Sequence, residues 1–167
     1  MKTSKMTKVL ISLDWDPTAK KVVETGVSLA KAMGAEIILL HVISDPKLYA
    51  SPNPFTVMGF AGYQYVNPLQ SASNTHLAKE DELKTAALKF LDNFKLHLGD
   101  DTIQTIVKTG DSAESILMVA RKVKADVIVL GSHSKKWLHN ITMGSVTKKV
   151  LNHTLKPVLI VPTKKQK

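Results

Sequence analysis

The residues best suited to ligand chemistry lie between Gly131 and Thr147, in the stretch GSHSKKWLHNITMGSVT. Gly131 follows a short, largely apolar run that is typical of a buried strand, and Gly144 and Ser145 stand where a helix is expected to begin. Small residues let backbone N–H groups approach an oxyanion closely, and a helix N-terminus offers unpaired N–H donors. We therefore predict that this stretch binds phosphate.

Strands and helices alternate along the chain and should position this stretch. Short runs rich in Val, Ile and Leu predict strands at 8–13, 36–43, 102–109, 126–130 and 157–162. Apolar residues at helical spacing predict helices after 16, over 76–98, from 111 and from 144. Such alternation predicts a parallel α/β sandwich, in which ligands bind at the carboxyl ends of the strands.

We expect a single domain over residues 1–167, with a flexible N-terminus at 1–7 and a charged tail at 163–167. Segment 44–75 breaks the alternation, since it holds four prolines and most of the aromatic residues. A connection of this length is unusual in a compact domain. It either covers the ligand or packs its aromatic residues on the sheet edge or on a partner subunit, and the sequence leaves both interpretations open.

The composition excludes several classes of protein. The chain has no cysteine, and so neither disulfides nor a thiolate metal site. The net charge is +9, but no basic and aromatic patch accompanies the lysines, which favours a solvated surface over nucleic-acid binding. No apolar run approaches the length of a membrane-spanning helix, and the N-terminus lacks the apolar core of a signal peptide. We expect a cytoplasmic protein that does not bind membranes.

Three polar side chains are assigned structural roles. Asp16, which precedes a proline, and Asp111, three residues before Glu114, are predicted to cap helices. The histidines show no metal-ligand spacing, so His41 is interpreted as a structural residue at a strand end. The chain also lacks G-x-x-x-x-G-K-[S/T] and G-x-G-x-x-G, which excludes the usual P-loop and dinucleotide-binding motifs.

The glycine spacing resembles the nucleotide-binding signature of the universal stress protein family, which is G-x-x-G, nine residues, then G-[S/T]. Here the motif is Gly131-x-x-Ser134, nine residues, then Gly144-Ser145. The resemblance covers nearly the whole chain, through KVLISLD, LLHVI, ADVIVLGSHS and MGSVTKKVLNHTLKPVLIVP. It implies a Rossmann-like three-layer sandwich, with a five-stranded parallel sheet in the order 3-2-1-4-5 and helices on both faces.

The resemblance also implies which residues surround an adenine nucleotide. The base and ribose would lie against Ser12, Leu13, Asp14 and the backbone of Val42, with Asp14 accepting from a ribose hydroxyl or helping to place a metal ion. Serine and threonine hydroxyls near the phosphates would add donors to the backbone N–H groups. The residues implied around the phosphates are Gly131, Ser134, Gly144, Ser145, Val146 and Thr147, and Leu130 is also implied as a nucleotide-binding residue.

The function implied is that of a nucleotide-dependent regulator of a stress response, without enzymatic activity. It would bind ATP, ADP or AMP, with Mg²⁺ as a candidate companion ion, and form a homodimer through Val158 to Val161. Ser134 departs from the signature, and a Cβ at a position that needs positive φ costs about 1 kcal/mol. Two alternatives stay open: a nucleotide-independent dimeric interaction module and, ranked last, a slow ATPase that depends on Asp14.

Overall fold

The computed structural model describes residues 7–44, 80–132 and 143–163. The strands and helices alternate along the chain, as predicted. The strands are β1 (Lys8–Leu13), β2 (Glu36–Ile43), β3 (Gln104–Thr109), β4 (Val127–Gly131) and β5 (Val158–Val161). The helices are α1 (Ala19–Met33), α2 (Glu80–Leu98), α3 (Ser112–Lys122) and α4 (Ser145–His153). Except for Ser44, the predicted long loop lies outside the described residues, as do nearly all of the predicted terminal segments.

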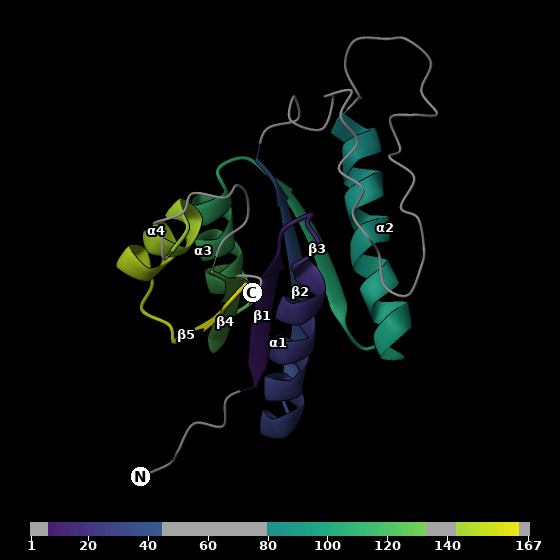
Figure 1. The fold of residues 1–167 in the computed structure, drawn as a ribbon, viewed down its shortest axis with the longest axis horizontal. Helices are drawn as coiled ribbons and strands as arrows, with labels where there is room; N and C mark the ends of the chain where they lie inside the picture. Colours follow the sequence, from purple (N-terminus) through teal and green to yellow (C-terminus); the bar gives the residue numbers. More distant parts are fainter. Residues whose placement is uncertain (1–6, 45–79, 133–142, 164–167) are drawn as a thin grey trace, which may run out of the picture.

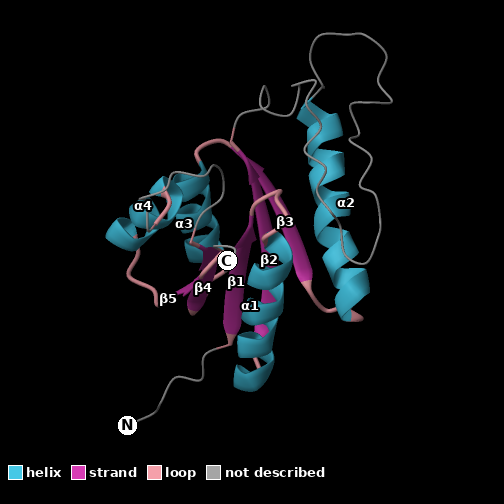
Figure 2. Ribbon diagram, in the orientation of Figure 1, coloured by secondary structure: helices cyan, strands magenta, loops and turns pink. Residues whose placement is uncertain are grey.

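The strands form one parallel sheet in the order β3-β2-β1-β4-β5, which confirms the expected topology. Figure 2 shows β1 between β2 and β4 at the centre of the sheet. The strand order reverses direction at β1, because the chain proceeds to one side through β2 and β3 and then to the other through β4 and β5. Ligands of doubly wound sheets bind at such a switch point.

Helices cover both faces of the sheet, so the predicted three layers are confirmed (Figure 1). On one face, Val9, Ile11 and Leu13 of β1 pack in a cluster with residues of α1 and α2. On the other face, Leu10 of β1 packs in a cluster with residues of α3 and Val150 of α4. β1 therefore alternates its side chains between two buried cores, as a central parallel strand does. Among the described residues, no helix has the length and apolarity needed to cross a membrane.

Polar residues in turns explain two shifts in the predicted boundaries, one at a helix start and one at a strand start. α1 begins at Ala19, because the Asp16 carboxylate accepts from the backbone N–H and the hydroxyl of Thr18 and so caps a turn that precedes the helix. The N-cap of α1 is Thr18, so the prediction that Asp16 is the N-cap was wrong by two residues. β3 begins at Gln104 because the Thr102 N–H donates to the Asp100 carboxylate, at 3.0 Å, in a turn.

The starts of α3 and α4 agree with the sequence, whereas the predicted start of the second helix at 76 lies outside the described residues. Asp111 caps α3, and its Oδ1 accepts from the Glu114 N–H at 2.9 Å. Gly144 is the N-cap of α4, with φ −67° and ψ 156°. This is an extended conformation that any residue can adopt. The glycine is therefore not required here for its backbone freedom. Its useful property is that it has no side chain.

Candidate functional site

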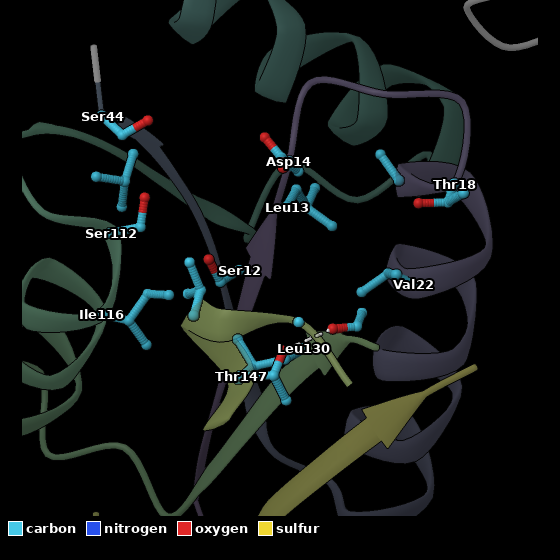
Figure 3. A pocket seen from close by; sticks show the side chains of 15 residues that line it. Ser12, Leu13, Asp14, Thr18, Val22, Ser44, Ser112, Ile116, Leu130 and Thr147 are labelled. Atoms are coloured by element: carbon cyan, nitrogen blue, oxygen red, sulfur yellow. Dashed lines mark hydrogen bonds between the residues drawn. The ribbon is translucent and has the colours of Figure 1, made fainter. Parts of the chain in front are cut away.

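A pocket opens at the carboxyl ends of β1, β2 and β4, where the first turns of α1, α3 and α4 meet (Figure 3). Its volume is about 170 Å³. Pockets that enclose a whole drug-sized ligand start at about 300 Å³, so this pocket holds part of such a ligand. Residues predicted to bind the nucleotide line it: Ser12, Leu13, Asp14, Val42, Leu130, Gly131, Gly144, Val146 and Thr147.

One half of the pocket is formed by the ends of β1 and β2, and we call it the strand half; it comprises Ser12, Leu13, Asp14 and Val42. The register pairs Ser12 with Leu40 and Leu13 with His41, which brings the ends of the two strands side by side. Asp14 follows β1 directly and is partly exposed, and its Oδ1 accepts from the Trp15 N–H at 3.0 Å. The strand half thus combines apolar walls with a hydroxyl and a carboxylate.

The strand half rests on a group of packed rings, in which His41 and Phe90 are buried and Trp15 is partly buried. His41 has no exposed surface, and its Nδ1 lies 2.9 Å from the Leu13 carbonyl oxygen. Because a carbonyl can only accept, Nδ1 carries the proton and donates to this bond. Trp15 stacks on Phe90 of α2 with ring centroids 5.4 Å apart, and His41 meets both rings edge-on at 5.7 Å. His41 is therefore structural, as predicted.

The other half of the pocket, the helix half, is formed by the end of β4 and the start of α4; it comprises Leu130, Gly131, Gly144, Val146 and Thr147. The Gly144 N–H donates to the Ser132 carbonyl oxygen at 2.8 Å, and the first bond within α4 runs from the Lys148 N–H to the Gly144 oxygen at 3.0 Å. The N–H groups of Ser145, Val146 and Thr147 precede that bond and have no acceptor within the helix. They form the positive end of the helix dipole, at the pocket.

Thr147 uses its hydroxyl differently from the expectation. The residue is 4% exposed, and its Oγ1 donates to the Gly131 carbonyl oxygen at 3.0 Å. A hydroxyl has a single proton, so in this structure Thr147 offers a ligand its backbone N–H rather than its side chain. Ser145 is exposed at the start of α4 and is not among the lining residues. Ser134 lies outside the described residues.

The acidic groups near the pocket differ in their surroundings. Asp16 is partly buried, and the loss of hydration raises the pKa of its carboxyl. The hydrogen bonds from Thr18 lower this pKa, and the Asp14 charge raises it by less than the burial does. At the start of α3, Lys149 of α4 lies 3.3 Å from Asp111 and 3.2 Å from Glu114. The hydrogen bond from the Glu114 N–H is the main reason that the pKa of Asp111 is lowered. These ion pairs connect α4 to the start of α3.

The side walls of the pocket consist of residues that were not predicted from the sequence. Figure 3 shows Thr18 and Val22 of the α1 end on one side and Ser112 and Ile116 of α3 on the other. Ala19 and Ser44 complete the described lining. The sequence contains a signal for these residues, because the first turn of any helix that follows a parallel strand lies at the carboxyl edge of the sheet. No group of three or more His, Asp or Glu side chains that could hold a metal occurs in residues 7–44, 80–132 and 143–163.

Comparison with known proteins connects this architecture to one family. The model of the Universal stress protein family matches residues 5–162. The Universal stress protein MJ0577 of Methanocaldococcus jannaschii is 29% identical over 159 residues, which cover 94% of this chain and 95% of the relative. The Universal stress protein YxiE of Bacillus subtilis is 31% identical over 158 residues, which cover 92% of this chain and 97% of the relative.

Solved structures agree with these matches. The structure of MJ0577 superposes with a TM-score of 0.67 at 27% identity, covering 98% of this chain and all (100%) of that chain. A universal stress protein in complex with cAMP superposes with a TM-score of 0.59 at 19% identity, covering 96% and 100%. The Arabidopsis thaliana protein At3g01520 with AMP bound gives 0.57 at 20% identity, covering 95% and 92%. At such identities the last two likenesses establish the shared fold.

Proposed function

The chain belongs to the universal stress protein family, and from this premise we propose that it binds ATP or a related adenine nucleotide and acts as a nucleotide-dependent regulator in a stress response. The observation that carries the proposal is the convergence of the predicted ligand residues on one pocket at the switch point of the sheet. Family members with cAMP or AMP bound support an adenine nucleotide as the ligand.

In this proposal the two halves of the pocket bind different parts of the nucleotide. The base and ribose lie in the strand half, where Leu13 and Val42 provide apolar contact and the Asp14 carboxylate accepts from a ribose hydroxyl. The phosphates lie at the helix half, where the N–H groups of Val146 and Thr147 and the helix dipole stabilise negative charge. The pocket volume of about 170 Å³ fits part of a nucleotide, so the phosphates extend out of it across the start of α4.

We propose that Mg²⁺ enters with the nucleotide instead of residing in the apoprotein. The described residues contain no preformed group of metal ligands. Mg²⁺ in nucleotide sites is commonly held by one or two carboxylates, water and the phosphates themselves. Asp14 is the one carboxylate among the described lining residues and is the side chain suited to this role.

We propose no catalytic step. Hydrolysis needs a positioned water and a group that accepts its proton, and a candidate base must lie within hydrogen-bond reach of that water. The described lining offers Asp14 alone, and the same carboxylate is assigned to the ribose or the ion. ATP turnover that is lost in Asp14→Ala and retained in Asp45→Ala would overturn this part of the proposal.

Calorimetric titration of ATP with Mg²⁺ into the wild type and Gly144→Val tests the binding. Valine can adopt the extended backbone of Gly144, so the variant should fold. Because Gly144 lines the pocket, we expect the added side chain to obstruct a phosphate at the start of α4. We expect binding in the wild type and its loss in Gly144→Val. Ala32→Val on the exposed surface of α1 is the control for the added side chain and should bind as the wild type does. Equal binding by Gly144→Val would contradict a phosphate site at α4.

The second candidate is a nucleotide-independent interaction module, which Ser134 at the second motif position favours. Such a protein would share the fold, and its pocket would not bind nucleotide. Purified wild type that shows neither bound nucleotide nor a rise in melting temperature with ATP would favour this candidate. A melting temperature that rises with ATP concentration would exclude it, because only a ligand of the folded state stabilises in this way.

We further propose a homodimer through β5. β5 pairs with β4 and is the last strand of the sheet, and its residues Val158, Leu159 and Ile160 are only partly buried in the single chain. The preceding Leu155 is 100% exposed. An edge strand with apolar neighbours is a ready site for a second copy. Light scattering should show a dimer for the wild type, a monomer for Ile160→Asp, and a dimer for Met118→Asp, whose side chain is 47% exposed on α3.

A further inference from the structure

Ser132, the residue after β4, occupies a position that the proposed binding site does not itself explain. It stands next to Gly131 at the start of the stretch that leads to α4, and it is 8% exposed. It is not among the residues that line the pocket. A buried serine that does not face a ligand must have its polar groups bonded within the protein, and these bonds show what it holds together.

The backbone of Ser132 connects two elements. Its N–H donates to the Val161 carbonyl oxygen of β5 at 2.9 Å, and its carbonyl oxygen accepts from the Gly144 N–H at 2.8 Å. The second bond joins the residue just before the segment 133–142 to the N-cap of α4. Both ends of the connection from β4 to α4 are therefore fixed to each other at Ser132.

The side chain of Ser132 adds a bond to the chain beyond β5. Its Oγ accepts from the Thr163 N–H at 3.0 Å and lies 3.2 Å from the Thr163 hydroxyl. Either hydroxyl can be the donor in that second contact. Ser132 thus connects the end of β4 to the N-cap of α4 through its backbone, and to the end of β5 through both its backbone and its side chain.

These bonds determine where the donors of the helix half stand. The Gly144 N–H is directed to Ser132, and the Thr147 hydroxyl donates to the Gly131 oxygen at 3.0 Å. The first turn of α4 is thereby held against residues 131–132 from both its cap and its third residue. The N–H groups that the first turn of α4 offers to a phosphate therefore keep a fixed direction. Backbone dipoles bind a charged group strongly when they are already oriented toward it.

We infer that Ser132 is the positioning residue of the helix half and couples phosphate binding to the end of β5. The inference rests on the proposed nucleotide function, since it assigns a support to that same site. Ser132 acts through its backbone bond to Gly144 and is not itself a lining residue of the pocket. Because coupling between two sites is reciprocal, a nucleotide whose phosphates hold α4 also protects the bond between Thr163 and Ser132.

The test compares ATP with adenosine, which has the same base and ribose and no phosphate. Ser132→Ala keeps both backbone bonds of residue 132 and removes the Oγ bonds to Thr163, so it tests the coupling to the end of β5. It should weaken ATP binding by up to about tenfold, the factor that corresponds to the loss of roughly one hydrogen bond. Adenosine binding should change less than about twofold, because the strand half does not depend on Ser132. Ser132→Thr, which retains the hydroxyl, should restore ATP binding. Ser115→Ala is the matched control, since Ser115 is another buried serine, 5% exposed, on α3.

Amide hydrogen exchange provides a readout that does not require a variant to fold. In the wild type, ATP should slow exchange of the Thr163 and Gly144 N–H groups, whereas adenosine should not. Thr163→Val keeps the Thr163 N–H and removes its hydroxyl, so it should weaken ATP binding by less than Ser132→Ala does.

Each outcome separates the inference from the proposed function. A wild type that binds neither ATP nor adenosine overturns both. If the wild type binds ATP but Ser132→Ala loses affinity for ATP and adenosine equally, the inference alone is overturned. The serine would then act on the stability of the whole fold. Unchanged ATP affinity in Ser132→Ala, or unchanged exchange at Thr163, also overturns the inference and leaves the nucleotide site intact.

Discussion

The two halves of the pocket are built in different ways. The strand half rests on packed rings, since Trp15 stacks on Phe90 and His41 lies beneath the Leu13 carbonyl. The helix half has small residues, and it is held by hydrogen bonds through Ser132 and Thr147. Core packing contributes several kcal/mol per large residue, whereas a hydrogen bond contributes about 1 kcal/mol. The strand half should therefore dominate stability, and the helix half should be the part that responds to a ligand.

The largest effect should come from removing a ring below the strand half. Phe90 is 4% exposed and contacts Trp15, His41 and Phe94. Phe90→Ala should lower the free energy of unfolding by about 3–5 kcal/mol, because it removes a large side chain and leaves a cavity. Urea denaturation gives the measurement. Leu88→Ala, at a position 40% exposed on the same helix, should change stability by no more than about 0.5 kcal/mol. Similar losses in both variants would show that the rings do not support this half.

Thr147→Val should affect binding more than folding. Valine fills the same space but cannot donate to the Gly131 oxygen, so the unfolding free energy should fall by about 1 kcal/mol. Because the first turn of α4 loses one of the hydrogen bonds that hold it in place, ATP affinity should fall roughly tenfold, while adenosine affinity stays nearly constant. Parallel denaturation and calorimetry distinguish the two effects. A large loss of stability with unchanged ATP binding would reverse the contrast between the halves.

Asp111→Ala should weaken the attachment of α4 to α3. The variant loses the cap to the Glu114 N–H and the ion pair with Lys149, and caps of this kind contribute about 1 kcal/mol. The folded pKa of Asp111 lies below 3.8, so the carboxylate stabilises the fold fully above its unfolded pKa and loses this effect as the pH falls through the folded pKa. The difference between wild type and variant should be constant from about pH 5 to 7 and shrink below about pH 4. A difference that grows in acid would refute the assignment.

The smallest effect is expected at Asp16, beside the strand half. Burial raises its pKa above 3.8, so the folded state binds this proton more tightly than the unfolded state does. Its contribution to stability is therefore greatest below pH 3.8 and is lost as the pH rises through the folded pKa. Asn retains an oxygen that accepts from Thr18 and carries no charge. Asp16→Asn should be slightly more stable than wild type at pH 7, with the difference vanishing in acid; a variant less stable at pH 7 would contradict this.

The sequence was informative where local chemistry decides the structure. The bounds of β1 and β2 follow from continuous apolar runs, and Asp111 caps α3 because its spacing to Glu114 allows one geometry. The strand order came from the resemblance rather than from periodicity, because apolar patterning does not say which strands pair. The ligand role of the predicted residues stays a prediction, although the pocket brings most of them together.

Long-range contacts account for what the sequence could not reveal. Thr147 was expected to donate to phosphate, but its hydroxyl faces Gly131, 16 residues earlier in the chain. The contact between Ser132 and Thr163 spans 31 residues, and neither residue stands in a pattern that would pair them. Such partners depend on how the sheet assembles, which no local spacing encodes.

The most direct test of the central claim is an amide chemical-shift titration of the wild type with ATP and Mg²⁺. Binding at the switch point should shift the signals of Asp14, Val42, Gly131 and Gly144, on both halves of the pocket. Adenosine should shift Asp14 and Val42 and leave Gly144 nearly unchanged, since it lacks the phosphates. The signals of Lys124, beyond the opposite end of the sheet, should not move. Absence of shifts at saturating ATP, or shifts confined to residues outside the pocket, would contradict the proposed nucleotide site.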